Sequence, residues 1–238
     1  MRWTACLALI GLASCVEVVE SGQTTRPAPQ PAAVQRPAPP AVTRDKVQQF
    51  LTVVQRVEPV AERECRARAP GSNCDFRIVV DDRPGQPVNA YQTLDRNGQP
   101  ILAFTLPMIA SVRNADELAF VMGHEAAHHI KGHIPRQQQS AAAGALILGG
   151  IAAVTGAGQG AVDQAARIGA GVGGRAFSKD FELEADALGT VIAHKSGYNP
   201  VRGVEFFSQI PDPGNRFLGT HPPNAQRIET VRRVASQL

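Results

Sequence analysis

The 238-residue sequence lacks several features that would place it in a large class of proteins. Its charged residues are scattered and sum to a net charge of only +3, without a long run of one sign, which disfavours a nucleic-acid-binding surface. Only four cysteines are present and no two have the CxxC spacing, so a redox motif or zinc ribbon is disfavoured. No internal repeat is evident. The length therefore indicates one main domain with a sizeable core.

Long apolar runs are also missing. The apolar stretch at the start of the sequence is too short to cross a bilayer. It follows Arg2 and ends at Leu12-Ala13-Ser14-Cys15, which resembles the lipobox of bacterial lipoproteins. We therefore expect residues 1–14 to be a lipoprotein signal peptide and Cys15 to carry the lipid that holds the protein at a membrane surface. The alternative is an uncleaved hydrophobic start with an incidental cysteine. By resemblance to such lipoproteins, Val16 is compatible with sorting to the outer membrane.

The segment after Cys15 is a predicted linker. Six prolines lie between Pro27 and Pro40, and almost nothing there could be buried. Proline-rich chains extend by about 3.1 Å per residue, so residues 15–43 would act as the lipid-bearing tether of a domain that covers residues 44–238.

Two cysteines would remain in the mature domain, Cys65 and Cys74. In an oxidising periplasm, this pair would form a structural disulfide that closes a small loop. The alternative is two free thiols.

The hydrophobic pattern predicts an α+β domain that is mainly helical. Pro59 is expected to kink or end the first helix, and Asn97-Gly98 is a strong hairpin signal. Asn114 is the expected N-cap of a helix that continues to about His129, with Glu117 completing something close to a capping box. Gly197 is the expected end of a later helix. Helices are predicted over 44–69, 114–129, 181–195, 201–209 and 225–238, and strands over 75–81, 88–94 and 101–106.

Residues 140–174 are dominated by alanine, glycine, leucine and isoleucine. The uninterrupted apolar run from Ala141 to Val154 is shorter than the roughly 20 residues that a membrane span needs. We expect packed or membrane-touching helices here, broken or bent at Gly149-Gly150 and Gly173-Gly174.

A candidate metal motif lies at His124-Glu125-Ala126-Ala127-His128, an HExxH arrangement. On a helix the two histidines lie about 40° apart, so both imidazoles can reach one ion. Glu125 lies about 100° from His124, where its carboxylate can act as the catalytic base. His129 and His133 are about 140° and 180° from His124 and are expected to face away from the ion.

A catalytic zinc needs a third protein ligand, and Glu182 is the candidate. Asp186 lies four residues later on the same helix face, where its carboxylate could accept the free N–H of a ligand histidine. Glu184 would point about 200° away and is expected to face solvent.

Together these segments resemble the metallopeptidase family of the HtpX-like proteases and the CAAX prenyl proteases, in particular its periplasmic lipoprotein branch. The likeness spans about Asp45 to the C-terminus. Its motifs are the strand Val88-Asn89-Ala90-Tyr91, the capped HExxH helix, the segment from Glu182 to Asp186, the turn Gly197-Tyr198-Asn199-Pro200, and His221-Pro222-Pro223 with Arg227.

The resemblance implies a gluzincin-type metallopeptidase with a small β-sheet packed on the HExxH helix and one Zn²⁺ per chain. It implies that the strand Asn89, Ala90 and Tyr91 holds substrate by edge pairing. It also places His221 near the metal, where it would stabilise the transition state or plug the open zinc position; the alternative is a loop histidine before a helix.

The function expected from this sequence is zinc-dependent endopeptidase activity at the bacterial cell envelope, in an outer-membrane lipoprotein that faces the periplasm. Its substrates would be polypeptides, either misfolded or membrane-associated. The competing hypothesis is a chaperone or assembly factor for outer-membrane proteins, which would use the zinc-peptidase fold as a binding scaffold and contact the outer-membrane assembly machinery.

Overall fold

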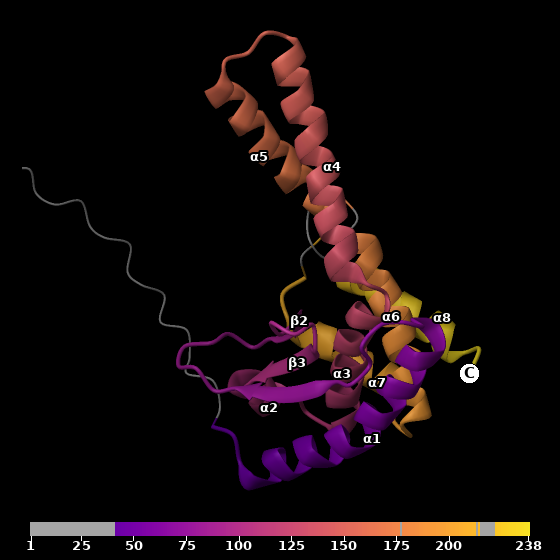
Figure 1. The fold of residues 1–238 in the computed structure, drawn as a ribbon. Coiled ribbons are helices and arrows are strands. Elements are labelled where there is room, and N and C mark those ends of the chain that lie inside the picture. Colours follow the sequence, from indigo (N-terminus) through magenta and orange to yellow (C-terminus); the bar gives the residue numbers. More distant parts are fainter. Residues whose placement is uncertain (1–40, 177, 213, 215–221) are drawn as a thin grey trace, which may run out of the picture. The chain divides into compact units, whose positions relative to one another are not determined.

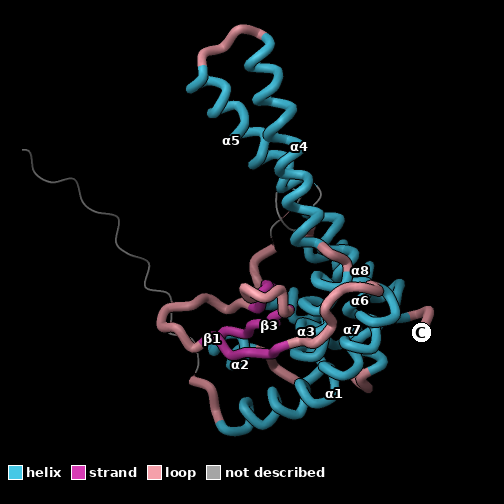
Figure 2. Tube along the Cα trace, viewed as in Figure 1, coloured by secondary structure: helices cyan, strands magenta, loops and turns pink. Residues whose placement is uncertain are grey.

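The computed structural model describes residues 41–176, 178–212, 214 and 222–238. The predictions for the signal peptide, Cys15, the linker up to residue 40 and His221 therefore lie outside the described residues. Figures 1 and 2 show the arrangement of the described elements. The helices are α1 Arg44–Arg68, α2 Leu106–Ser111, α3 Ala115–Ile130, α4 His133–Val154, α5 Gln159–Ala176, α6 Ser178–Lys195, α7 Pro200–Gly203 and α8 Asn224–Ala235; the strands are β1 Arg77–Asp81, β2 Ala90–Leu94 and β3 Pro100–Thr105; a 3₁₀ helix, η1, covers Val204–Gln209.

The expected mainly helical α+β class is confirmed, with a three-stranded sheet in the order β1-β3-β2. β1 runs parallel to β3, whereas β2 and β3 form the antiparallel hairpin that Asn97-Gly98 predicted. Gly98 has a φ of 78°, a conformation that glycine adopts without steric cost. β2 is consequently an edge strand of the sheet.

Helix α1 packs an apolar face on the core, and Pro59 does not end it. Proline removes one helical hydrogen bond, but Val57, Val60 and Ala61 on either side are buried, so their packing keeps the chain helical. The helix therefore does not end at Pro59, which was one of the two expectations for this residue. At the last turn, Cys65 forms a disulfide with Cys74, nine residues further on.

Helix α3 is the central helix of the domain and contacts α1, α6, α7 and β2. The side chain of Asn114 caps it, as predicted, by accepting hydrogen bonds from the backbone of Asp116 and Glu117. The capping box is different from the expected one. Glu117 accepts from the backbone and side chain of Arg113 instead of reaching the N–H of Asn114, and thereby ties α3 to the preceding loop.

Two glycines let α3 and α6 touch through their backbones. A Cβ added at Gly189 would lie 2.8 Å from the backbone nitrogen of His124, and one added at Gly123 would lie 2.9 Å from the carbonyl oxygen of Gly189. These distances leave no room for a methyl group. The close approach brings His124 on α3 and Glu182 on α6 to the same place.

The substitution Gly189→Ala should therefore both destabilise the fold and weaken metal binding. The added methyl group forces the two helices apart, at a cost of about 1–3 kcal/mol in the free energy of unfolding. Urea unfolding measures this change. The matched control is Gly150→Ala, where the added Cβ meets nothing within 4 Å, and this variant should gain about 0.5–1 kcal/mol from helix propensity. Equal stability of the two variants would contradict the prediction.

Helices α4 and α5 form a two-helix hairpin whose legs lie side by side (Figure 1). Of the break or bend expected at Gly149-Gly150 and Gly173-Gly174, a break is wrong, because the helices run through both pairs and the turn falls around Gly156, with a φ of 83°. Glycine serves close packing here. A Cβ at Gly144 or Gly169 would collide with the backbone of the opposite leg, as would one at Gly173.

Most of the large apolar side chains of this hairpin are exposed. Among the described residues, no helix has both the length and the apolar content that a membrane crossing requires. The exposed large apolar residues of the hairpin are Leu146, Ile147, Ile151, Val154, Ile168 and Val172.

Candidate metal centre

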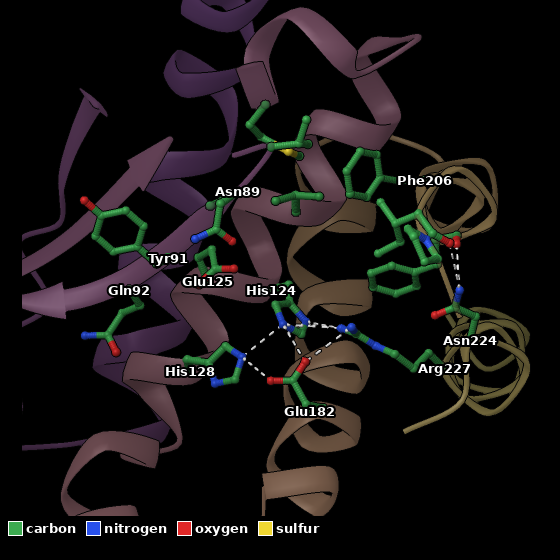
Figure 3. A pocket seen from close by; sticks show the side chains of 17 residues that line it. Asn89, Tyr91, Gln92, His124, Glu125, His128, Glu182, Phe206, Asn224 and Arg227 are labelled. Atoms are coloured by element: carbon green, nitrogen blue, oxygen red, sulfur yellow. Dashed lines mark hydrogen bonds and ion pairs between the residues drawn. The ribbon is translucent and has the colours of Figure 1, made fainter. Parts of the chain in front are cut away.

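The structure brings together three side chains that could hold a metal ion. His124 and His128 lie one turn apart on α3, and Glu182 faces them from α6 (Figure 3). One ligand atom from each lies within 4.8 Å of the other two. His124 and Glu182 are buried, and the His128 side chain is 18% exposed, so the cluster borders on solvent.

Two of the three spacings between these atoms match a tetrahedral zinc site, and the distance between the two histidine nitrogens is shorter. The Nε2 atoms of His124 and His128 are 2.9 Å apart, and they lie 3.6 and 3.4 Å from the two carboxylate oxygens of Glu182. Zinc at its usual distance of about 2.0–2.2 Å from each ligand places the ligand atoms roughly 3.3–3.6 Å apart. Two imidazoles and one carboxylate are also a common donor set for a catalytic zinc, and they leave one position open.

His124 is oriented by a buried carboxylate. Its Nδ1 lies 2.9 Å from Oδ1 of Asp186, so Nδ1 donates its proton there and Nε2 is left with a free lone pair for a metal. Burial would raise the pKa of Asp186, but the hydrogen bond and charge of Arg227, and then those of His124, outweigh it and hold that pKa below its usual value. Asp186 thus stays ionised.

Arg227 contributes to the family likeness, but its place in the sequence suggested no role for it. From α8, its guanidinium makes two hydrogen bonds of 2.7 Å to Asp186, lies 3.3 Å from Glu182 and stacks 3.7 Å from the ring centre of Phe207. Its side chain is only 6% exposed. A buried arginine almost always has a carboxylate partner, so its position four residues after Pro223 carried no signal until the fold placed it beside Asp186.

His133 corrects an expectation. It was predicted to face away from the ion, yet its Nδ1 lies 2.8 Å from Nδ1 of His128. The 100° rule failed because α3 ends at Ile130, and Gly132, with a φ of 64°, turns the chain before α4 begins at His133. Burial, and then the neighbouring His128, lower the pKa of His133 to about 4.

Glu184 was expected to face solvent, and its side chain is 35% exposed, but its carboxylate is also paired. Its carboxylate pairs with Arg136 of α4 at 2.8 and 3.1 Å, and it lies 3.4 Å from Nε2 of His133. The hydrogen bond with Arg136 is the main cause that lowers the pKa of Glu184 to about 2. His129 does lie away from the three metal-ligand candidates, where its Nε2 bonds the carbonyl of Asn73.

A cavity of about 460 Å³ opens beside the three candidate ligands. Strand β2 and the preceding Asn89 form one wall, and Phe206, Phe207 and Asn224 lie on another. Figure 3 shows Glu125 between Asn89 and the two histidines. Tyr91 donates its hydroxyl to Asp81 at 3.1 Å, so its ring braces the sheet.

The main-chain N–H and C=O groups of β2 alternate in direction along the strand, toward β3 at one residue and toward the opposite edge at the next. Asn89 and Thr105 pair through the N–H of Thr105 and the carbonyl of Asn89. In an antiparallel ladder the groups that point toward one neighbour recur at every second residue. The N–H and C=O groups of Ala90 and Gln92 therefore point toward the edge of the sheet where the described part of the chain adds no further strand.

The comparison with protein families decides which group of proteins this is. The family model described as peptidase family M48 matches residues 48–235, which include every described residue of the metal cluster. The chain belongs to peptidase family M48. M48 enzymes are metallopeptidases, so the coarse chemistry expected from the HExxH helix agrees with the family.

Among curated proteins, the M48 domain is similar to the beta-barrel assembly-enhancing proteases of Escherichia coli strain K12 and of Shigella flexneri. Each is 29% identical over 147 residues, which is 52% of this chain. The alignment covers 28% of each relative, so the chain spans well under half of the length of the proteins it matches.

Proposed function

We propose that this M48 protein is a zinc-dependent endopeptidase of the bacterial cell envelope. The observation that carries the proposal is the cluster of His124, His128 and Glu182 at one cavity, with the carboxylate of Glu125 beside it. A metal-ligand set alone could be structural. The additional carboxylate and the open cavity are what a hydrolytic site needs.

The chemistry follows from the positions of these groups. Zinc held by the two histidines and Glu182 would polarise the scissile carbonyl and lower the pKa of water. Glu125 would accept a proton from the attacking water on its carboxylate and deliver it to the nitrogen of the leaving amine. Asp186 and Arg227 would keep His124 in one orientation during the reaction.

The substrate would be an extended polypeptide. The free main-chain groups of Ala90 and Gln92 support pairing of a peptide segment along β2, next to Glu125. Main-chain pairing places little demand on sequence, which suits cleavage of misfolded proteins. His221 would act at the same site, as the family likeness implies.

A second function is favoured by the name of the curated relatives, which are assembly-enhancing proteases for β-barrels. Our chain would accordingly act on precursors of outer-membrane proteins, in contact with the assembly machinery and tethered through a lipid on Cys15. A pure chaperone needs no general base, so Glu125 would have no function in it. The two functions separate when the Glu125→Gln variant is tested for rescue of a deletion strain, since a scaffold would rescue and a protease would not.

Metal content tests the proposed site directly. The purified full chain should contain about one zinc per molecule, and His128→Ala and Glu182→Ala should each lose it, because two protein ligands hold zinc far more weakly than three. Inductively coupled plasma mass spectrometry measures the ratio. The zinc-loaded protein should also degrade unfolded casein, and a chelator should stop it.

The matched control is His129→Ala, which removes a histidine of the same helix that bonds Asn73. It should keep its zinc. A wild-type protein that takes up no zinc even after dialysis against the metal would overturn the proposed function.

A further inference from the structure

The second ligand histidine lacks the kind of partner that the first one has. His124 donates its Nδ1 proton to the carboxylate of Asp186 at 2.9 Å. For Nδ1 of His128, the partner at hydrogen-bond distance among the described residues is not a carboxylate but Nδ1 of His133, at 2.8 Å. Two imidazole nitrogens this close must share one proton, which one ring donates and the other accepts.

The direction of this hydrogen bond follows from the metal site. If Nε2 of His128 holds the metal, as the proposed function requires, its ring proton is on Nδ1. Nδ1 of His133 must then accept, and the proton of His133 is on Nε2. That atom faces the Glu184 carboxylate at 3.4 Å, so each donor has an acceptor.

His133 is itself firmly held. Its ring stacks on Phe181 with centroids 4.6 Å apart and planes 9° from parallel. The guanidinium of Arg136 lies over the ring of Phe181, 4.3 Å from its centre. Both terminal nitrogens of the same guanidinium also donate to the carboxylate of Glu184. The His133 side chain is only 5% exposed. Its orientation is therefore fixed by α4 and α6 together.

We propose that His133 is a positioning residue of the metal site, whose Nδ1 fixes the tautomer and the ring rotation of His128. This inference rests on the proposed function and assigns Glu184 and Arg136 as the groups that hold His133 in place. Partners of this kind raise the affinity of a ligand histidine for zinc, and their loss typically weakens zinc binding about 10- to 100-fold.

Three substitutions at this position separate a hydrogen-bond role from a packing role. Leucine and asparagine have nearly the same size, but the amide oxygen of asparagine lies close to the place of Nδ1 and can accept the proton of His128. Glutamine carries its amide further out, near the place of Nε2. We expect His133→Leu and His133→Gln to bind zinc about 10- to 100-fold more weakly, and His133→Asn to recover most of the affinity.

The readout is the zinc dissociation constant of the full chain, measured by competition with a chromophoric chelator, together with the visible spectrum of the cobalt-substituted protein. His129→Leu is the control and should bind like the wild type. Thermal unfolding of each metal-free variant checks the fold, and if His133→Leu does not fold, the comparison of His133→Asn with His133→Gln decides.

Two outcomes would overturn the inference, and they are distinguishable. Wild-type affinity in His133→Leu, or equal affinity in the Asn and Gln variants, would show that His133 only packs, while the proposed function would stand. Failure of the wild type itself to bind zinc would remove the proposed function and the inference with it.

Discussion

Glu125→Gln should lower kcat for casein cleavage by about 10²- to 10⁴-fold, the usual contribution of a general base. The amide has the same shape as the carboxylate but cannot take a proton from water. Glu125 is not one of the three candidate ligands, so zinc content should stay at one per chain. An assay with fluorescently labelled casein gives kcat, and metal analysis of the same sample gives the zinc content.

Glu229→Gln is the matched control, because this glutamate is exposed on α8 and the change is chemically identical. It should leave kcat unchanged. Turnover by Glu125→Gln at the wild-type rate would exclude Glu125 as the base. Loss of zinc in that variant would show instead that the carboxylate helps to hold the metal.

Arg227→Met should produce the largest loss of stability, about 3–5 kcal/mol in the free energy of unfolding. The substitution leaves Asp186, which is fully buried, as a charge without its guanidinium partner. An uncompensated buried carboxylate is costly because it has lost its hydration. Urea unfolding of the metal-free protein measures the change.

Arg232→Met, on the exposed side of the same helix, should change stability by no more than about 0.5 kcal/mol. The double variant Asp186→Asn/Arg227→Met removes both charges and should regain part of the stability lost by Arg227→Met, as replaced ion pairs often do. A small effect of Arg227→Met alone would mean that the Asp186 carboxylate is solvated in the folded protein.

The parts of the site that the sequence predicted are those set by local periodicity. His124 and His128 share a face because four residues make about one helical turn, and the same rule aligns Glu182 with Asp186. The rule fails where a helix ends. His133 belongs to a different helix from His128, and the left-handed turn at Gly132 brings it back toward the cluster.

Long-range partners could not be predicted from spacing. Arg227 is 41 residues from Asp186, and Arg136 is 48 from Glu184; each pair depends on how helices cross. The prediction of helix breaks at the glycine pairs of residues 140–174 failed for another reason. Glycine weakens an isolated helix, but a neighbouring backbone in contact with it can more than offset that cost, and only the fold shows the neighbour.

The glycines at which the backbones of α4 and α5 touch, Gly144, Gly169 and Gly173, also determine which side chains the hairpin exposes. Backbones that touch leave little space between the legs for a large side chain, so most of the leucines, isoleucines and valines lie on the outer side. Separation of the legs would therefore expose little additional apolar area, and hydrophobic burial opposes it only weakly. The apolar face of the hairpin is thus presented to the surroundings with the two legs packed, and no opening of the hairpin is needed to expose it.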